Sequence, residues 1–240
     1  MEQTIAFIRD VLGHSGDQCC ADQGGGGGGE ACATKQTNLA AVVGPGKSST
    51  SIAVQNLLQV FRMPQIGYSA TSTDLTNKEE FGYYLRVVPS DVWQARAMLE
   101  IVKRFGWTYI AVVYSAGNYG EKGFEELQHF IEGEKNICIA ISEKIKSLAE
   151  PKAFDALLTT IAHTHPRPQV AICFCEGQTI RSIFQAVKRS QNSQNRNAND
   201  TSRLFQWIGS DAWADRQDVV EHVEEEAAGS FSMRIHSPKV

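Results

Sequence analysis

The amino-acid sequence predicts an α/β fold of two parallel sheets flanked by helices. Short apolar runs alternate with longer amphipathic segments along most of the chain, and this alternation is typical of βαβ units. The alternation breaks at Pro89–Asp91 in the manner of a crossing between two lobes. Turns rich in hydroxyl and charged side chains follow several apolar runs, at the carboxyl ends of the predicted strands, where open α/β sheets bind their ligands.

Length and composition allow one large domain or two modest ones. The 240 residues are 42% hydrophobic and 21% charged, as in ordinary globular proteins, and the formal net charge of -4 gives no indication of a nucleic-acid partner. No apolar run approaches the ~18 residues of a membrane span. The amphipathic start of the chain lacks the basic and apolar regions of a signal peptide. These features predict a cytosolic protein or a fragment of a longer chain.

Residues 1–88 are predicted to form a partial first lobe. Residues 1–13 have the apolar spacing of a helix. Residues 14–36 are predicted to be a disordered loop, because the run Gly24–Gly29 does not favour any one conformation. The elements expected next are strands at Leu39–Val43, Met63–Gly67 and Tyr83–Val88 and helices at 48–61 and 74–80. So few strands, in a chain that opens on a helix, indicate an incomplete lobe.

Residues 89–235 are predicted to form the second lobe, and residues 236–240 a return crossing toward the first. Strands and helices alternate strictly here, which predicts a parallel sheet. The expected strands are Thr108–Tyr114, Ile137–Ile141, Gln169–Cys175, Leu204–Gly209 and Ser230–Ile235. The expected helices are Asp91–Phe105, Glu121–Gly133, Pro151–Thr164, Glu176–Ser190 and a short helix from Arg216.

The candidate binding residues follow predicted strands. Ser48 opens a helix whose free backbone N–H groups suit an anion such as a carboxylate. Asp211 suits an ammonium group, and the ring of Tyr119 offers cation–π attraction. Each residue also has a plainer interpretation, since Ser48 and Asp211 could only cap helices and Tyr119 could only pack. Their joint placement at strand ends, together with Thr71 and Glu176, favours a cleft for a zwitterion.

Enzyme activity is not predicted. Ala41–Ser48 nearly matches the phosphate loop G-x-x-x-x-G-K-[ST], which makes a nucleotide hydrolase a competing hypothesis. The preceding strand continues through Val43, however, and leaves only a short loop for phosphates. No G-x-S-x-G nucleophile turn is present. The six cysteines lack zinc-ligand spacing, so no metal or other cofactor is expected and buried free thiols are a plain interpretation.

Four long segments resemble the extracellular ligand-binding domain of metabotropic glutamate receptors, which are class C G protein-coupled receptors. They are GPGKSSTSIAVQNLLQVFRMPQIGYSATSTDL, YYLRVVPSDVWQARAMLEIVKRFGWTYIAVVYSAGNYGEKG, VAICFCEGQTIR and WIGSDAWADR. YSATS, CFCEG and SDAWADR are most similar to group I. The resemblance covers residues 1–13 and about 37–240. It implies a two-lobed, periplasmic-binding-protein-like Venus flytrap that closes on L-glutamate.

The resemblance also implies roles for residues. Ser48 and the Thr71 backbone would hold the ligand's α-carboxylate, and Asp211, the Tyr119 ring, the Thr71 hydroxyl and the Ser69 carbonyl would hold its α-ammonium. The full set implied to bind ligand is Ser48, Ser69, Ala70, Thr71, Tyr119 and Asp211. The residues implied to line the cleft around it are Tyr68, Asp91, Glu176 and Arg216.

Covalent features are implied as well. Cys173 and Cys175 resemble a close-spaced disulfide of the family, and Cys138 resembles the cysteine that bridges to a stalk domain. Cys19, Cys20 or Cys32 would link two subunits. The sequon at Asn199 is a candidate glycosylation site.

The implied setting is a receptor at the plasma membrane, with this region on the extracellular side. Its partners would be L-glutamate, a second copy through the first lobe, and a G protein through a seven-helix domain. Lys47 departs from the family pattern, where group I usually has serine, and adds a cation beside the carboxylate site. A free-standing amino-acid binding protein of the periplasmic type is the alternative with the same fold.

Overall fold

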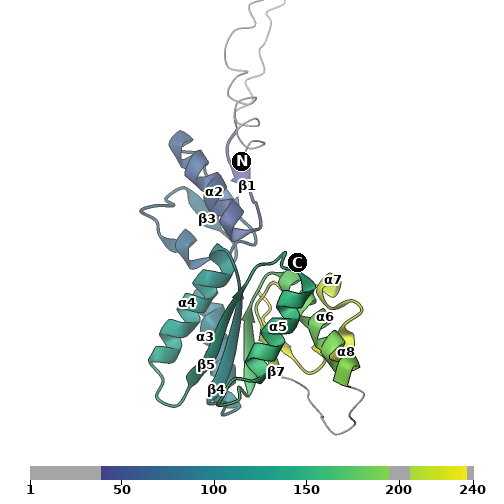
Figure 1. Cartoon of the computed structure of the whole chain (residues 1–240). Coiled ribbons are helices and arrows are strands. Elements are labelled where there is room, and N and C mark those ends of the chain that lie inside the picture. Colours follow the sequence, from purple (N-terminus) through teal and green to yellow (C-terminus); the bar gives the residue numbers. More distant parts are fainter. Residues whose placement is uncertain (1–38, 195–205, 237–240) are drawn as a thin grey trace, which may run out of the picture.

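A computed structural model of the chain describes residues 39–194 and 206–236 (Figure 1). Several sequence predictions lie outside these residues: the helix at 1–13, the loop at 14–36 and the crossing at 237–240. The cysteines and the sequon outside them are Cys19, Cys20, Cys32 and Asn199. We call residues 39–88 the first lobe and residues 89–236 the second lobe, following the predicted division of the chain.

The fold is α/β, with two parallel sheets flanked by helices, as predicted (Figure 1). The first lobe has a three-stranded sheet in the order β1-β2-β3. Its elements are β1 (Val42–Val43), α2 (Ser48–Leu58), η1 (Gln59–Phe61), β2 (Gln65–Gly67), η2 (Thr73–Thr76) and β3 (Tyr84–Arg86). Its apolar cluster is small and comprises Ala70, Leu75, Phe81 and Tyr84, with Ile52 of α2 packed against it.

The second lobe has a five-stranded parallel sheet in the order β5-β4-β6-β7-β8. Its strands are β4 (Tyr109–Ser115), β5 (Cys138–Ile145), β6 (Val170–Phe174), β7 (Gln206–Gly209) and β8 (Phe231–Ser232). Its helices are α3 (Asp91–Arg104), α4 (Asn118–Glu132), α5 (Pro151–Ala162), α6 (Gly177–Gln194), α7 (Gln217–Val220) and α8 (Glu224–Ala227). Each long helix links two strands and packs back onto the sheet (Figure 1).

Side chains alternate between the two faces of this sheet, because successive residues of a strand point to opposite sides. Ile110 and Val112 of β4 pack with helices α3 and α4, whereas Ala111 and Val113 pack with α5 and α6. The second lobe therefore has three layers, with an apolar core on each face of the central sheet.

The order of the strands reverses beside β4. The chain passes from β4 outward to β5, then crosses back to β6 on the other side of β4. Helices α4 and α6, which follow β4 and β6, pack on opposite faces of the sheet. In an open parallel sheet, a crevice for a ligand forms where neighbouring strands lead away in this manner. The reversal therefore places such a crevice at the carboxyl ends of β4 and β6.

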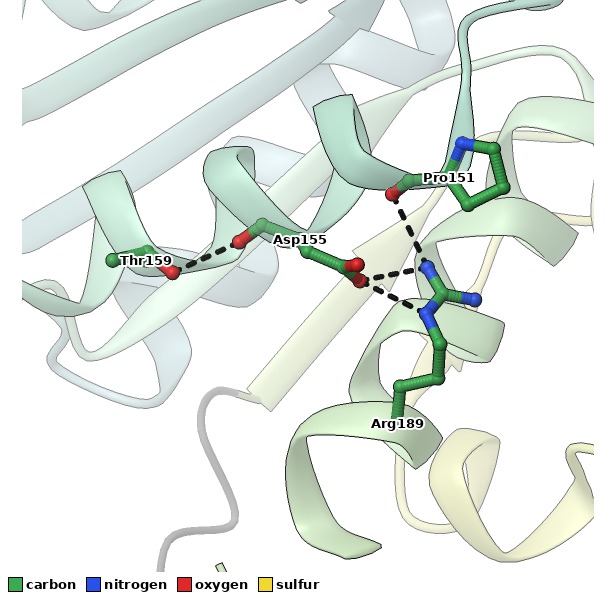
Figure 2. A network of polar contacts seen from close by, with 4 residues as sticks. All are labelled: Pro151, Asp155, Thr159 and Arg189. Atoms are coloured by element: carbon green, nitrogen blue, oxygen red, sulfur yellow. Dashed lines mark hydrogen bonds and ion pairs between the residues drawn. The ribbon is translucent and has the colours of Figure 1, made fainter. Parts of the chain in front are cut away.

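A polar clamp joins α5 and α6 on the outer face of the second lobe (Figure 2). Arg189 of α6 donates to Asp155 Oδ1 from Nε at 3.0 Å and from Nη2 at 2.7 Å, and Nη2 also donates to the Pro151 carbonyl at 3.2 Å. The Thr159 hydroxyl donates to the Asp155 carbonyl one turn along α5. A guanidinium that binds both a carboxylate and a helix's first-turn carbonyl fixes the relative position of the two helices.

Two predicted boundaries were wrong in ways that concern the site. Helix α4 begins at Asn118, so Tyr119 lies in its first turn and not in a loop. Gly117 is the N-cap residue of α4 and has a φ of 124°, and its N–H donates to the Glu121 carboxylate at 3.0 Å, which stabilises an early helix start. Strand β5 continues to Ile145 because it pairs with β4 along the whole length of that strand.

Candidate functional site

A pocket of about 330 Å³ lies between the two lobes at the carboxyl ends of the strands. This volume is at the lower end of the range for small-molecule sites, so it suits a small ligand. The first lobe contributes Gly46, Lys47, Ser48 and Ser69. The second lobe contributes Tyr119, Glu176, Gly177, Asp211, Ala212 and Arg216. These residues come from the segments that follow β1, β2, β4, β6 and β7.

The first-lobe wall is a tight turn between β1 and α2. Gly44 has a φ of 86°, and a Cβ there would lie 2.9 Å from Cε1 of Tyr68, so the turn needs glycine to pass under that ring. Lys47 occupies the N-cap position of α2 and Ser48 is its first residue. The buried Ser48 hydroxyl accepts a hydrogen bond from the Ser72 N–H at 3.3 Å, so Ser48 joins the two turns and is not the helix cap.

The second-lobe wall is a chain of hydrogen bonds. The Tyr119 hydroxyl donates to Asp211 Oδ1 at 2.6 Å, and the Asp211 N–H donates to Gln94 Oε1 at 2.9 Å. Gln94 Nε2 then donates to Asp91 Oδ1 at 2.7 Å. Burial, and next the nearby charge of Asp211, raise the pKa of Tyr119 well above its usual value. Tyr119 therefore stays neutral and donates its proton toward the Asp211 carboxylate.

Asp91 lies behind this wall, at the crossing between the lobes. Its side chain is fully buried, and its N–H donates to the Thr71 carbonyl at 2.9 Å. Burial, followed by the charge of Asp211, raises the pKa of Asp91 to about 7, while Arg86 and hydrogen-bonding groups oppose the shift. The Arg86 guanidinium also donates to the Thr71 carbonyl at 3.1 Å, so this guanidinium and the Asp91 N–H together fix the turn after β2.

Asp91→Asn is expected to flatten the pH dependence of stability. Below about pH 3 the carboxyl is mostly protonated in both states. As pH rises toward 7, the unfolded state loses this proton first, which lowers the free energy of unfolding of the wild type by about 4 kcal/mol across that window, at about 1.4 kcal/mol per pKa unit. The free energy of unfolding of the variant does not fall in this way, so at pH 8 the variant is more stable relative to the wild type than it is at low pH. Urea unfolding of the full-length protein at pH 4.5 and pH 8 measures the difference, and parallel profiles for both proteins would contradict it.

Charged side chains surround the mouth of the pocket. Lys47 Nζ lies 2.9 Å from Glu176 Oε1, and the Ser147 hydroxyl donates to Glu176 Oε2 at 3.3 Å. Arg216 is paired with Asp218 at 2.6 Å. Gly177 gives Arg216 room, because a Cβ there would lie 2.7 Å from Arg216 Nη1. The mouth therefore presents two cations beside the carboxylates of Glu176 and Asp211.

The structure brings together six of the predicted site residues around the pocket: Ser48, Ser69, Tyr119, Glu176, Asp211 and Arg216. It places the other four elsewhere. Ala70 and Thr71 are buried next to Ser69, Asp91 is buried behind Asp211, and Tyr68 is exposed over the glycine turn. The sequence interpretation missed Gln94, whose only signal was its spacing of three residues from Asp91 on one helix face.

The cysteines of the second lobe occupy two environments. Cys173 and Cys175 are buried at the end of β6 and form a disulfide with Cα atoms 5.3 Å apart. Cys138, at the start of β5, is an exposed free thiol. The disulfide lies directly before Glu176, so it restrains the segment that carries this carboxylate into the pocket.

In the ranges 39–194 and 206–236, no helix is long and apolar enough to cross a bilayer. The same part of the chain holds no group of three metal-binding side chains. In a phosphate loop the lysine binds a phosphate group. Here the Lys47 ammonium is paired with Glu176 across the cleft, which does not favour the nucleotide-hydrolase hypothesis.

Known proteins resemble this chain over almost its whole length. Metabotropic glutamate receptor of Drosophila melanogaster is 33% identical over 99% of the chain, and metabotropic glutamate receptor 4 of Macaca fascicularis is 35% identical over 97%. Metabotropic glutamate receptor 8 of Homo sapiens is 33% identical over 97%. The chain spans 23–24% of the length of these receptors. Residues 11–240 match the family described as the receptor family ligand binding region. The chain therefore belongs to the family of receptor ligand-binding regions, and it is similar to this part of metabotropic glutamate receptors.

Proposed function

We propose that the pocket between the lobes binds L-glutamate. The observation that carries this proposal is the placement of opposite binding groups on facing walls. The start of α2 with Ser48 lies on one wall, and the Tyr119–Asp211 pair lies on the other. A helix N-terminus attracts a carboxylate, whereas a carboxylate beside an aromatic ring attracts an ammonium group. An α-amino acid carries both groups.

In the proposed complex the α-carboxylate lies at Ser48 and the start of α2, beside the Ser69–Thr71 turn. The α-ammonium lies at Asp211 and the Tyr119 ring. Arg216 lines the same pocket, and this cation favours a ligand with a second carboxylate over a neutral amino acid, whereas Lys47 is engaged by Glu176. The printed names of the related receptors refer to glutamate, which meets this requirement.

We also propose the cellular setting that the relatives suggest. The region lies on the extracellular side of a plasma-membrane receptor that pairs with a second copy through its first lobe. Ligand favours the arrangement to which it binds more tightly, and closure of the two lobes is the change that reaches a G protein. The segments that resemble group I receptors support coupling to the phospholipase C route.

Calorimetric titration of the full-length protein tests the ligand. L-Glutamate is expected to bind with one site per chain, and L-glutamine and glutarate at least tenfold more weakly, because each lacks one of the charged groups. Absence of binding by L-glutamate, or equal binding of glutarate, would reject the proposed site. In cells, a rise in inositol phosphates on addition of L-glutamate is expected, and its absence despite binding would reject only the signalling route.

A further inference from the structure

One ion pair bridges the two lobes at the mouth of the pocket. Lys47 Nζ lies 2.9 Å from Glu176 Oε1 and 3.0 Å from Glu176 Oε2, so the ammonium contacts both oxygens. The two residues are 129 positions apart in the sequence. Lys47 precedes the first helix of the first lobe, and Glu176 immediately precedes α6 of the second lobe. The pair therefore forms only when the lobes approach each other.

Lys47 is poorly suited to its local position. It occupies the N-cap of α2, where a small side chain with a hydrogen-bond acceptor is preferred, and it makes no capping hydrogen bond. A positive charge at a helix N-terminus is also repelled by the helix dipole, and the first turn of α2 has no acidic residue to offset this. The residue therefore costs α2 some stability, and Glu176 is the group that offsets this cost.

A second polar contact joins the lobes away from Lys47. Asp74 of η2 accepts a hydrogen bond from Asn118 Nδ2 at 2.5 Å and lies 3.7 Å from Lys122 Nζ, both on α4. In the described part of the chain, the lobes therefore meet at this contact as well as at the Lys47–Glu176 pair and the Asp91–Thr71 hydrogen bond at the crossing. Only the Lys47–Glu176 pair lies among the residues that line the pocket.

We propose that the Lys47–Glu176 pair is a charge latch, which favours the closed arrangement of the lobes whether or not a ligand is bound. The latch is independent of which ligand the pocket takes. The side chain of Lys47 is 56% exposed and that of Glu176 is 25% exposed, so water partly screens the ion pair. Such pairs shift an equilibrium by about two- to fivefold. Salt screens them, so the effect decreases as ionic strength rises.

The test measures closure without any added amino acid. Fluorescent dyes are placed in the full-length protein at Val60 of the first lobe and Leu148 of the second, which are 73% and 95% exposed. Lys47→Ser and Glu176→Gln are each expected to lower the closed-to-open ratio by about two- to fivefold at low salt. The charge swap K47E/E176K is expected to restore most of it. The difference between wild type and each single variant should disappear at about 1 M salt.

Lys103→Ser is the matched control. Lys103 pairs with Glu100 and Glu134, all within the second lobe, so its removal should leave the ratio unchanged. Unchanged ratios in both single variants, or a charge swap that stays as open as they are, would overturn the latch. Because no ligand is added, these outcomes do not depend on whether L-glutamate binds, which the titration decides separately.

Discussion

Asp211→Asn is expected to weaken the binding of L-glutamate to the full-length protein by about 30-fold to several thousand-fold, which corresponds to about 2–5 kcal/mol. The substitution keeps the shape of the side chain and removes its charge. Tyr119 cannot replace that charge, because burial and the neighbouring carboxylates keep its hydroxyl protonated. A ligand ammonium would then lie beside the neutral Tyr119 hydroxyl without a counter-charge. Calorimetric titration of wild type and variant measures the loss.

Asp215→Asn is the control for this experiment. Asp215 lies four residues further along, pairs with Arg234 at 2.8 Å and is 68% exposed, outside the residues that line the pocket. It should leave the affinity unchanged. Glutarate, which has no ammonium group, should bind the Asp211→Asn variant at least as well as it binds the wild type. An affinity for L-glutamate that survives in the variant would show that Asp211 does not hold the ammonium group.

Trp213→Ala is expected to lower the free energy of unfolding by about 3–5 kcal/mol, as for other buried aromatic residues. The Trp213 ring is buried, and it packs edge-on against Phe184 with ring centroids 4.9 Å apart. It also lies directly over Gly209, where a Cβ would come within 2.1 Å of its Cε3 atom. Trp213 thus anchors the segment from Ser210 to Arg216 against the core, and its loss should also weaken ligand binding through Asp211.

Urea unfolding of the full-length protein measures this effect, with Trp93→Ala as the control. Trp93 is the same residue type but is 61% exposed on α3, so its substitution should change stability by no more than about 0.5 kcal/mol. A midpoint shift of similar size in the two variants would mean that the Trp213 contacts contribute little. Binding that is lost while stability is retained would assign Trp213 a direct role at the ligand.

The class of fold and the parallel order of strands could be predicted because they depend on local patterns. The apolar run before Ser115 predicts a strand, and the glycine turn at Gly44 predicts the end of another. Neither prediction requires knowledge of distant contacts. The first residues of helices were harder to predict. The early start of α4 depends on the hydrogen bond from the Gly117 N–H to the Glu121 carboxylate, and helix propensities do not include such a contact.

Strand ends marked some residues of the site, such as Ser48 and Asp211, whereas Ser69 and Arg216 were predicted from the family resemblance alone. Asp211 follows a clear strand, whereas Gln94 lies on a helix and reaches Asp211 from 117 positions away. Likewise, the sequence shows that Lys47 departs from the family pattern, but it does not predict the ion pair with Glu176. That pair forms only because the two lobes approach each other. Contacts of this range are set by the complete fold and leave no signature in the adjoining sequence.

The hydrogen-bond chain from Tyr119 through Asp211 and Gln94 to Asp91 joins the pocket to the lobe crossing. The charge of Asp211 is one of the causes that keep a proton on Asp91. A cation that settles beside Asp211 offsets that charge and so makes the proton on Asp91 easier to lose. Occupancy and protonation are then thermodynamically linked, and the linkage is reciprocal. If the proposed site is right, the affinity for an ammonium ligand therefore depends on the pH of the surroundings.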